Sequence, residues 1–179
     1  MMCKNRSLRQ ANISESKSIW SLYQEVIQDL NRKEILQWNE SYPTYEYIQS
    51  SIINKECWIY TSHNQIIASV VLNQWQDPAW RIIPWHCCDH STLVIHALVV
   101  HPRYQGQGLG KLMVEAIEGL ALSLNYESIR LDAFSKNKVS NLLYKKLNYH
   151  DRGTVCLTYK PLDNQMYHCY EKELLQKLT

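Results

Sequence analysis

Hydrophobic residues in this chain follow two spacings, one typical of helices and the other typical of strands. The helical spacing, with apolar residues three or four positions apart, covers 19–30, 44–53, 109–124 and 138–147. Runs of β-branched and aromatic residues predict strands over 57–61, 65–75, 93–100, 128–134, 149–159 and 165–172, and a weak alternation predicts another over 7–13. The order β-α-α-β-β-β-α-β-α-β-β predicts a mixed α/β fold.

Polar residues between these segments predict where the elements begin and turn. Ser14 is the expected N-cap of the first helix, and Pro43 or Thr44 begins the second. Residues 62–64 make a tight turn between two antiparallel strands. Asn148 follows the last helix, where a left-handed residue commonly ends one. Residues 76–91 show no period, so we expect a loop of the length that is often functional.

Composition narrows the class of protein without indicating an activity. The 179 residues fit a single domain, 1–179, with 45% apolar and 20% charged residues. A net charge of +2 without a basic run argues against a nucleic-acid partner, and no apolar segment is long enough to cross a membrane. The six cysteines lack metal-ligand spacing, so we expect no metal, reduced thiols and a cytoplasmic protein.

The most distinctive segment joins the strand over 93–100 to the helix over 109–124. His101-Pro102 ends the strand, because proline has no amide hydrogen to give to a sheet. Residues 105–110 then read Gln-Gly-Gln-Gly-Leu-Gly and hold three of the five glycines of the chain. A glycine turn that leads into a helix directs backbone N–H groups and the positive end of the helix dipole toward one point. The segment therefore predicts an anion site, most often one for a phosphate.

Three phosphate-binding patterns compete for this turn. A P-loop needs Gly-Lys followed by Ser or Thr, but Gly110-Lys111 is followed by Leu112. A dinucleotide-binding GxGxxG that starts at Gly106 needs glycine at position 111, where lysine stands. The third pattern, Gln/Arg-x-x-Gly-x-Gly/Ala, is matched in full by residues 105–110.

The third pattern is that of an acyl-CoA pyrophosphate loop, and the chain resembles the GCN5-related N-acetyltransferase (GNAT) family in more than this loop. The segments that follow the family's order and spacing are Leu98-Val99-Val100-His101-Pro102, the helix after the loop, the strand SIRLDAF over 128–134, and Asn137-x-x-Ser140-x-x-Leu143-Tyr144-x-x-Leu147-Asn148-Tyr149. The similarity covers 92–149 strongly and the flanks by element order alone. Asn148 stands where the family commonly has glycine, and Ser140 where alanine is common; both changes are tolerable in or after a helix.

The resemblance implies a GNAT acyl-CoA N-acyltransferase fold, with a mostly antiparallel central sheet that splays between its fourth and fifth strands and is flanked by helices. It also implies acetyl-CoA as co-substrate, lying between the strand that ends at Val100 and the strand over 128–134. Backbone groups of Leu98 and Val100 would pair with the pantetheine arm, and the N–H of Val99 or Val100 would stabilise an oxyanion. The residues expected to hold the pyrophosphate are Gln105, Gly106, Gln107, Gly108, Leu109, Gly110 and Lys111.

By the same resemblance, the reaction transfers an acetyl group from acetyl-CoA to a primary amine of a small molecule or peptide, by direct attack through a tetrahedral intermediate. Tyr144 matches the family tyrosine whose hydroxyl meets the CoA sulfur, where a phenol can act as general acid. Asn137 matches a residue that contacts the CoA arm, and it is also a good helix N-cap.

The sequence leaves the general base open. In a regular strand, one face holds Val94, His96, Leu98 and Val100. His96 therefore interrupts an apolar face near the expected reaction centre, and imidazole titrates in the useful range. A hydrogen-bonded core histidine explains this position slightly better. Asp89 and His90, just before the strand, are the alternative base.

The acceptor site is expected in the N-terminal helices and the loop after Trp75. Trp75, Trp80 and Trp85 offer aromatic walls and Asp77 a carboxylate, which together suit an amine cation, although the same tryptophans would equally cover the sheet. The alternatives to an acetyl-CoA-dependent enzyme are another acyl-CoA donor or acceptor and a CoA-sensing module without turnover. A homodimer is considered as the assembly.

Overall fold

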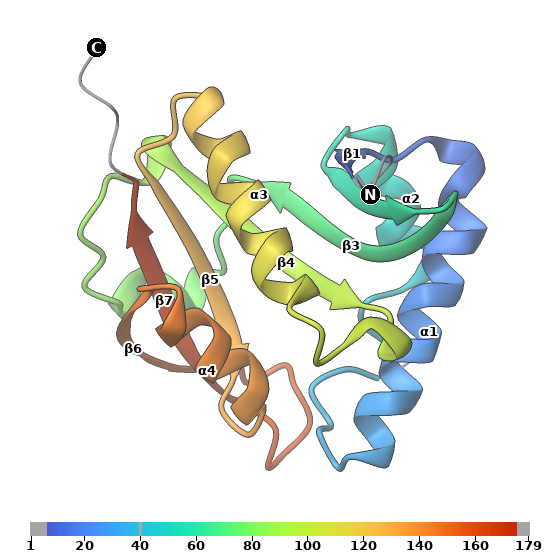
Figure 1. Ribbon diagram of the computed structural model, residues 1–179. Coiled ribbons are helices and arrows are strands. Elements are labelled where there is room, and N and C mark those ends of the chain that lie inside the picture. The colour runs from blue at the N-terminus through green and yellow to red at the C-terminus, as the bar shows by residue number, and fades with distance from the viewer. Residues whose placement is uncertain (1–6, 40, 175–179) are drawn as a thin grey trace. The chain divides into compact units, whose positions relative to one another are not determined.

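The computed structural model describes residues 7–39 and 41–174, which form a seven-stranded sheet and accompanying helices (Figure 1). The sheet order is β1-β2-β3-β4-β5-β7-β6. The strands are β1 (Ser7–Gln10), β2 (Cys57–Ser62), β3 (Gln65–Asn73), β4 (Thr92–Val100), β5 (Ser128–Phe134), β6 (His150–Cys156) and β7 (Met166–Glu173). The α-helices are α1 (Ser16–Arg32), α2 (Tyr45–Ile53), α3 (Leu109–Ser123) and α4 (Lys138–Lys146). The predicted mixed α/β fold is confirmed.

Strand pairing is antiparallel for β1–β2, β2–β3, β5–β7 and β6–β7. β4 and β5 are parallel, and their ladder pairs Thr92–Val94 with Ser128–Arg130. The mostly antiparallel sheet is therefore confirmed, whereas the expected splay between the fourth and fifth strands stays a prediction.

The chain divides into two compact units. Of the described residues, the first unit takes 7–39, 41–72 and 96–113, and the second takes 73–95 and 114–174. β4 and α3 each give residues to both units. The expectation of one domain over 1–179 stays a prediction, and its two ends lie outside the described residues.

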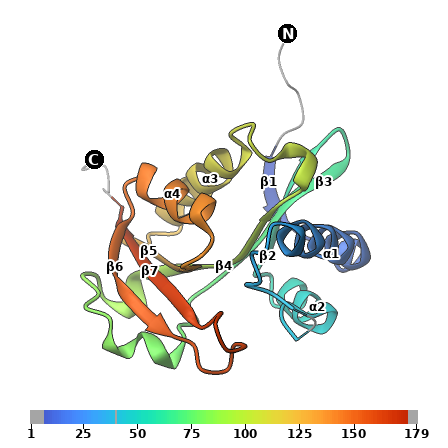
Figure 2. The same ribbon diagram turned by 90° about the horizontal axis from the view of Figure 1, so that it is seen from below.

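The core of the first unit lies under α1 and α2, which lie next to each other (Figure 2). Both helices turn apolar residues spaced three or four positions apart toward β2, as their sequence pattern predicted. The buried residues of this core are Ile19, Leu22, Tyr23, Val26, Ile48, Ile52, Cys57, Ile59 and Val99.

The beginnings of the helices depend on polar side chains that only partly follow the sequence prediction. Thr44 is confirmed as the N-cap of α2, because its Oγ1 accepts a hydrogen bond from the Tyr47 N–H at 3.1 Å. Ser14 is not a cap. The chain enters α1 through a 3-10 turn, where the carboxylate of Glu15 accepts the Asn12 N–H at 2.9 Å.

The β2–β3 hairpin has the tight turn expected over 62–64. His63 and Asn64 have φ of 50° and 63°, the left-handed pair that matches the twist of a two-residue hairpin. The loop over 76–91 contains two short 3-10 helices, Pro78–Ile82 and Asp89–Ser91.

In the second unit, helices cover one face of β5, β7 and β6, and residues 73–91 cover the other (Figure 2). On the helix face, the Tyr170 hydroxyl donates to Asn141 of α4 at 2.8 Å. On the other face, Arg130 of β5 contacts Gln76 and Asp89. Because side chains alternate along each strand, one set of residues packs against the helices and the other packs against residues 73–91.

The buried faces of α3 and α4 are narrower than their sequence pattern predicted. α3 buries positions about four apart, namely Leu109, Met113, Val114, Ile117 and Ala121. The predicted face residues that are instead exposed are Leu112, Leu124, Val139 and Leu142. Apolar spacing marks a stripe on a helix, but the width of the contact depends on what packs against it. Among the described helices, none is long and apolar enough to cross a membrane.

Candidate active site

The turn after β4 begins with a buried histidine. His101 Nδ1 accepts the Arg103 N–H at 3.1 Å and so caps the 3-10 helix Pro102–Tyr104, while its Nε2 lies 3.2 Å from the Glu25 carboxylate. His101 and Pro102 therefore end the strand together and set the direction in which the chain enters the glycine loop.

Two positions of the loop have a backbone conformation that favours glycine over every other residue. Gly106 and Gly108 have φ of 72° and 80°, a backbone region that side chains disfavour. A Cβ at either position would meet no heavy atom within 4 Å, so the protein leaves open space in front of the turn. Gly110 belongs to the first turn of α3. Open space beside a helix N-terminus suits an anion, and the binding of a pyrophosphate at this turn stays a prediction.

The two glutamines of the loop hold its backbone. Gln105 Nε2 donates to the Val100 carbonyl at 3.0 Å, and Gln105 Oε1 accepts from Lys33 Nζ at 3.2 Å. Gln107 Nε2 donates to the Arg103 carbonyl at 2.8 Å. Gln105 thus occupies one of the two lone pairs of the Val100 carbonyl, and the pairing of Leu98 and Val100 backbone groups with the pantetheine arm stays a prediction.

β4 is not a regular strand. Ala97 has φ of 48°, and its carbonyl accepts a hydrogen bond of 2.7 Å from the hydroxyl of the fully buried Tyr23. A left-handed residue shifts the alternation of side chains along a strand, so the prediction that His96 and Leu98 share one face of a regular strand is wrong. The irregular backbone lies beside the residues expected to bind the thioester.

α4 is fixed at both ends as the sequence predicted. The Asn137 side chain accepts the Ser140 N–H at 3.1 Å, and the Asn137 N–H donates to the Phe134 carbonyl at 2.9 Å. Asn148 has φ of 63° and ends the helix. Asn137 is thus confirmed as an N-cap, and its contact with the CoA arm stays a prediction.

Tyr144 lies on the buried face of α4. Its ring contacts those of Tyr149 and Tyr170, with centroids 5.6 Å and 5.8 Å away. Within the described part of the chain, no hydrogen bond of its hydroxyl group is found. Burial raises the pKa of Tyr144, and the negative charge of Asp132 raises it further. The phenol is therefore protonated at neutral pH, as a general acid must be.

Asn141 positions this helix, and the sequence prediction missed it. Asn141 Nδ2 donates to the carbonyls of Phe134 and Asn137 at 2.8 Å each, and its Oδ1 accepts from the Tyr170 hydroxyl at 2.8 Å. One side chain thus joins α4, the end of β5 and β7. A buried amide inside an apolar helical pattern was the signal that could have identified it.

An arginine and a glutamate, both fully buried, anchor residues 76–89 to the sheet. Arg130 Nε lies 3.0 Å from Glu171, its Nη1 contacts Asp89 at 2.5 Å, and its other amino group donates to the Cys87 carbonyl. Glu171 also accepts the backbone N–H groups of His86 and Cys87 at 2.8 Å and 3.2 Å. Paired and hydrogen-bonded in this way, the two charges are tolerated inside the protein.

The four residues predicted to bind the acceptor have different surroundings. Trp75 is 58% exposed, whereas Trp80 is buried. Trp85 is half-buried, with the guanidinium of Arg130 4.5 Å from its ring centroid. Asp77 caps the 3-10 helix Pro78–Ile82 through the Ala79 N–H at 2.8 Å. These contacts explain Trp80 and Trp85 as cover for the sheet, and the role of all four in acceptor binding stays a prediction.

Asp132 lies on the same face of β5 as Arg130 and pairs in register with Cys169 of β7. It is half-buried, and burial raises its pKa to about 6; the charge of Lys160 opposes this shift and that of Asp77 adds to it. The sequence prediction passed over this residue, because an aspartate in an alternating strand normally faces solvent.

Three potential metal ligands meet near the end of β7. The side-chain donor atoms of His86, Cys87 and Glu173 all lie within 4.8 Å of one another. His86 Nδ1 and Glu173 are already 2.8 Å apart, and Arg152 lies 3.5 Å from the same carboxylate. Cysteine spacing did not reveal this group. The prediction that the protein uses no metal stays a prediction.

Sequence comparison decides the family. The model of the Acetyltransferase (GNAT) family matches residues 23–149, which is more than half of the chain. The chain belongs to the GNAT family. No curated protein matches it.

Solved structures support the GNAT fold. A GNAT acetyltransferase from Streptococcus agalactiae is 20% identical, with 97% of this chain and 98% of that chain covered and a TM-score of 0.80. An acetyltransferase-type protein from Salmonella typhimurium, solved with its cofactor acetyl-CoA, is 12% identical over 98% of both chains, with a TM-score of 0.73. The ribosomal-protein-S18-alanine N-acetyltransferase from Escherichia coli is 12% identical over 94% of both chains, with a TM-score of 0.68. The fold expected from the sequence is confirmed.

The structure distinguishes between the candidate bases of this GNAT protein. The pKa of Asp89 is lowered, first by the hydrogen bond from Arg130, so Asp89 is a weak base at neutral pH. His90 is exposed and His96 is half-buried on β4. Asp132, whose pKa lies much closer to neutrality, joins His96 as a candidate.

We expect Asp132→Asn to stabilise the protein at pH 7.5 by about 1 kcal/mol, less than the full pKa shift implies because the side chain is half-exposed. An acid whose pKa is raised by folding binds its proton more tightly in the folded state, so stability falls as pH rises from about 4 to about 6. The difference from wild type should therefore shrink as pH is lowered toward 4. Thermal unfolding at several pH values measures this difference in stability. If Asp132→Asn were less stable than wild type at pH 7.5, the raised pKa of Asp132 would be contradicted.

Proposed function

We propose that this GNAT protein is an N-acetyltransferase that transfers an acetyl group from acetyl-CoA to a primary amine by direct attack. The observation that carries the proposal is the glycine loop, with its open space beside the N-terminus of α3, in a chain that belongs to an acetyltransferase family. Acetyl-CoA supplies an activated thioester carbonyl. The residues of this chain bind it, orient it and move protons.

Each unit contributes its own set of proposed functional residues. In the first unit, the backbone of residues 105–111 binds the pyrophosphate, and backbone groups of Leu98, Val99 and Val100 bind the pantetheine arm and thioester. In the second unit, Asn137 contacts the CoA arm and the Tyr144 hydroxyl donates a proton to the departing thiolate. A base, His96 or Asp132, takes the proton that the acceptor amine loses.

The proposal also extends to properties of the whole protein. The acceptor is a small molecule or a peptide, and nucleic acid, membrane and metal are not involved. The protein acts in the cytoplasm. The rival functions are a GNAT enzyme with another acyl-CoA donor or an alcohol acceptor, and a CoA sensor without turnover.

Isothermal titration calorimetry with acetyl-CoA and CoA tests the proposal. We expect both to bind wild type, and we expect Gly108→Val to weaken binding about tenfold or more, because its side chain strains the left-handed backbone and fills the open space. If neither compound bound to wild type, the proposed function would be contradicted. If Gly108→Val bound acetyl-CoA as tightly as wild type, the glycine loop would not be part of the binding site.

Gly119→Ala is the matched control. A Cβ at Gly119 also meets no heavy atom within 4 Å, but this glycine lies inside α3, where alanine is favoured by about 1 kcal/mol. The control should be as stable as wild type or more so and should bind acetyl-CoA equally well.

A further inference from the structure

Four charged or hydrogen-bonding side chains of the second unit act on one another: the Tyr159 hydroxyl bonds Asp77, the Lys160 ammonium lies near the Tyr159 ring, and the charges of Lys160 and Asp77 act on Asp132 of β5. This group consists of Asp77, Asp132, Tyr159 and Lys160. Tyr159 and Lys160 belong to the segment between β6 and β7, where Gln165 Nε2 donates to the Lys160 carbonyl at 2.9 Å. Tyr159 is 67% exposed, and Asp132 and Lys160 are half-buried, so the group borders solvent at Tyr159.

The two carboxylates of this group differ in what they bind. Asp77 is satisfied by the Tyr159 hydroxyl at 2.8 Å and by the Ala79 N–H at 2.8 Å. No side chain of the described residues donates a hydrogen bond to Asp132. A half-buried carboxylate without such a donor gains more from a cationic ligand than one that is already hydrogen-bonded.

Lys160 brings a positive charge to the same place. Its ammonium lies 5.7 Å from the ring centroid of Tyr159 and 6.0 Å from that of Tyr167, and it is half-buried. Burial lowers the pKa of Lys160, and the charges of Asp132 and Asp77 oppose this shift. A partly desolvated ammonium gains from an anion brought close to it.

We propose that Asp132 binds the ammonium group of the acceptor and that Lys160 binds a carboxylate carried beside that ammonium. The acceptor is then a small zwitterionic amine, of which an α-amino acid is the simplest. This inference rests on the proposed N-acetyltransferase function and names its substrate class. Asp132 also interacts electrostatically with Tyr144, the proposed general acid, within the same unit.

The charges of the group argue against a polyamine. A second ammonium on the acceptor would meet the like charge of Lys160 instead of a free carboxylate, and like charges at short range repel. Asp77 already accepts two hydrogen bonds, so it gains less from a second ammonium than Asp132 does. A molecule with one ammonium and one carboxylate pairs with both Asp132 and Lys160.

An acceptor panel read by thiol release from acetyl-CoA tests the inference. It contains amino acids, the carboxamides of the same amino acids, and spermidine. We expect kcat/KM to be at least about tenfold higher for the acids than for the carboxamides, a difference of about 1.4 kcal/mol. Lys160→Met should reduce this preference to less than about threefold, mainly by raising KM for the acids, because one favourable charge pair is lost.

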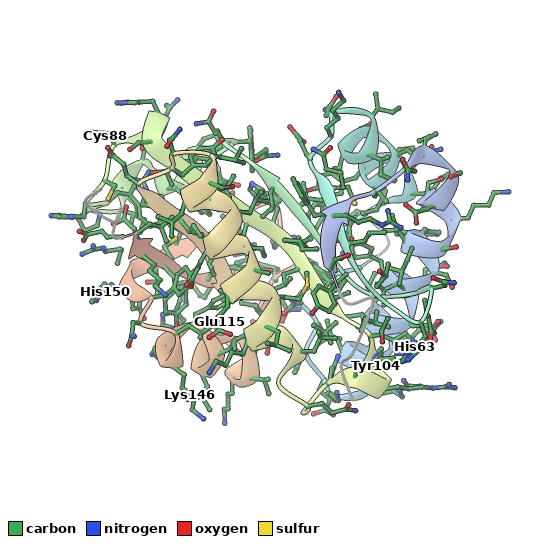
Figure 3. The ribbon with its side chains drawn as sticks, turned by 45° about the horizontal axis from the view of Figure 1, so that its top comes forward. His63, Cys88, Tyr104, Glu115, Lys146 and His150 are labelled. Carbon is green, nitrogen blue, oxygen red and sulfur yellow. The ribbon has the colours of Figure 1, made fainter. Side chains whose placement is uncertain are left out.

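Two further variants separate the possible outcomes. Asp132→Asn should lower kcat/KM for acids and carboxamides alike, since both carry the ammonium. Lys146→Met, at the exposed end of α4 (Figure 3), should change nothing. Carboxamides or spermidine used as well as the acids, or an acid preference that survives Lys160→Met, would overturn the inference while leaving an acetyltransferase. Absence of thiol release with every amine would instead count against the proposed function.

Discussion

Tyr144→Phe is expected to lower kcat by about 100-fold or more, because it removes the hydroxyl proposed to protonate the CoA thiolate. The phenyl ring keeps the contacts with Tyr149 and Tyr170. Since no hydrogen bond of the Tyr144 hydroxyl is found in the described residues, the variant should unfold at nearly the same temperature as wild type. Steady-state kinetics with an amine acceptor, together with calorimetry of acetyl-CoA binding, measures both effects.

Tyr149→Phe is the matched control for this prediction. Tyr149 is also buried, its ring meets that of Tyr144 edge to face, and among the described residues no group has hydrogen-bond geometry to its hydroxyl. Loss of activity in both variants would point to packing and not to proton transfer. Acetyl-CoA binding with no turnover in wild type would favour the sensor alternative, in which Tyr144→Phe changes nothing.

Arg130→Met should have the largest effect on stability, a loss of about 3–5 kcal/mol in the free energy of unfolding. Arg130 and Glu171 are both fully buried, so the substitution removes the buried cation beside Glu171 and leaves that carboxylate only the partly exposed Arg152 as an ion-pair partner. It also removes the contacts that hold Gln76, Asp89 and the Cys87 carbonyl. Urea denaturation followed by tryptophan fluorescence measures the loss.

The double variant Arg130→Met/Glu171→Met and the single variant Arg152→Met complete the test. Removing both buried charges should recover part of the lost stability, since no charge is then stranded. Arg152 reaches Glu171 at 2.9 Å from a partly exposed position, so its loss should have a smaller effect, about 1 kcal/mol. A double variant less stable than Arg130→Met would contradict the buried-charge explanation.

Most of the fold followed from local sequence signals, and the errors occurred where distant residues meet. The hairpin turn at His63 and Asn64, the cap at Thr44 and the left-handed Asn148 each depend on a few neighbouring residues. By contrast, Ala97 adopts a left-handed backbone in the middle of an apolar run, with its carbonyl bound by Tyr23 of α1. No periodicity in the sequence indicates a contact over that separation.

The glycine loop and the Tyr144 helix could be read from sequence because their chemistry is local. Backbone N–H groups, glycines with positive φ and a helix cap lie within a few positions of one another, and spacing preserves their geometry. Asp132, Lys160 and the Arg130–Glu171 pair could not be read in this way. The interaction of Asp132 with Lys160 and that of Arg130 with Glu171 join residues at least 28 positions apart in the chain. The alternation of β5 alone predicts that its charged side chains face solvent. The local sequence thus determined the element order, the glycine turn proposed as an anion site, and the family resemblance. Only the tertiary structure decided which carboxylate is held next to which cation, because burial and pairing depend on all the elements that pack together.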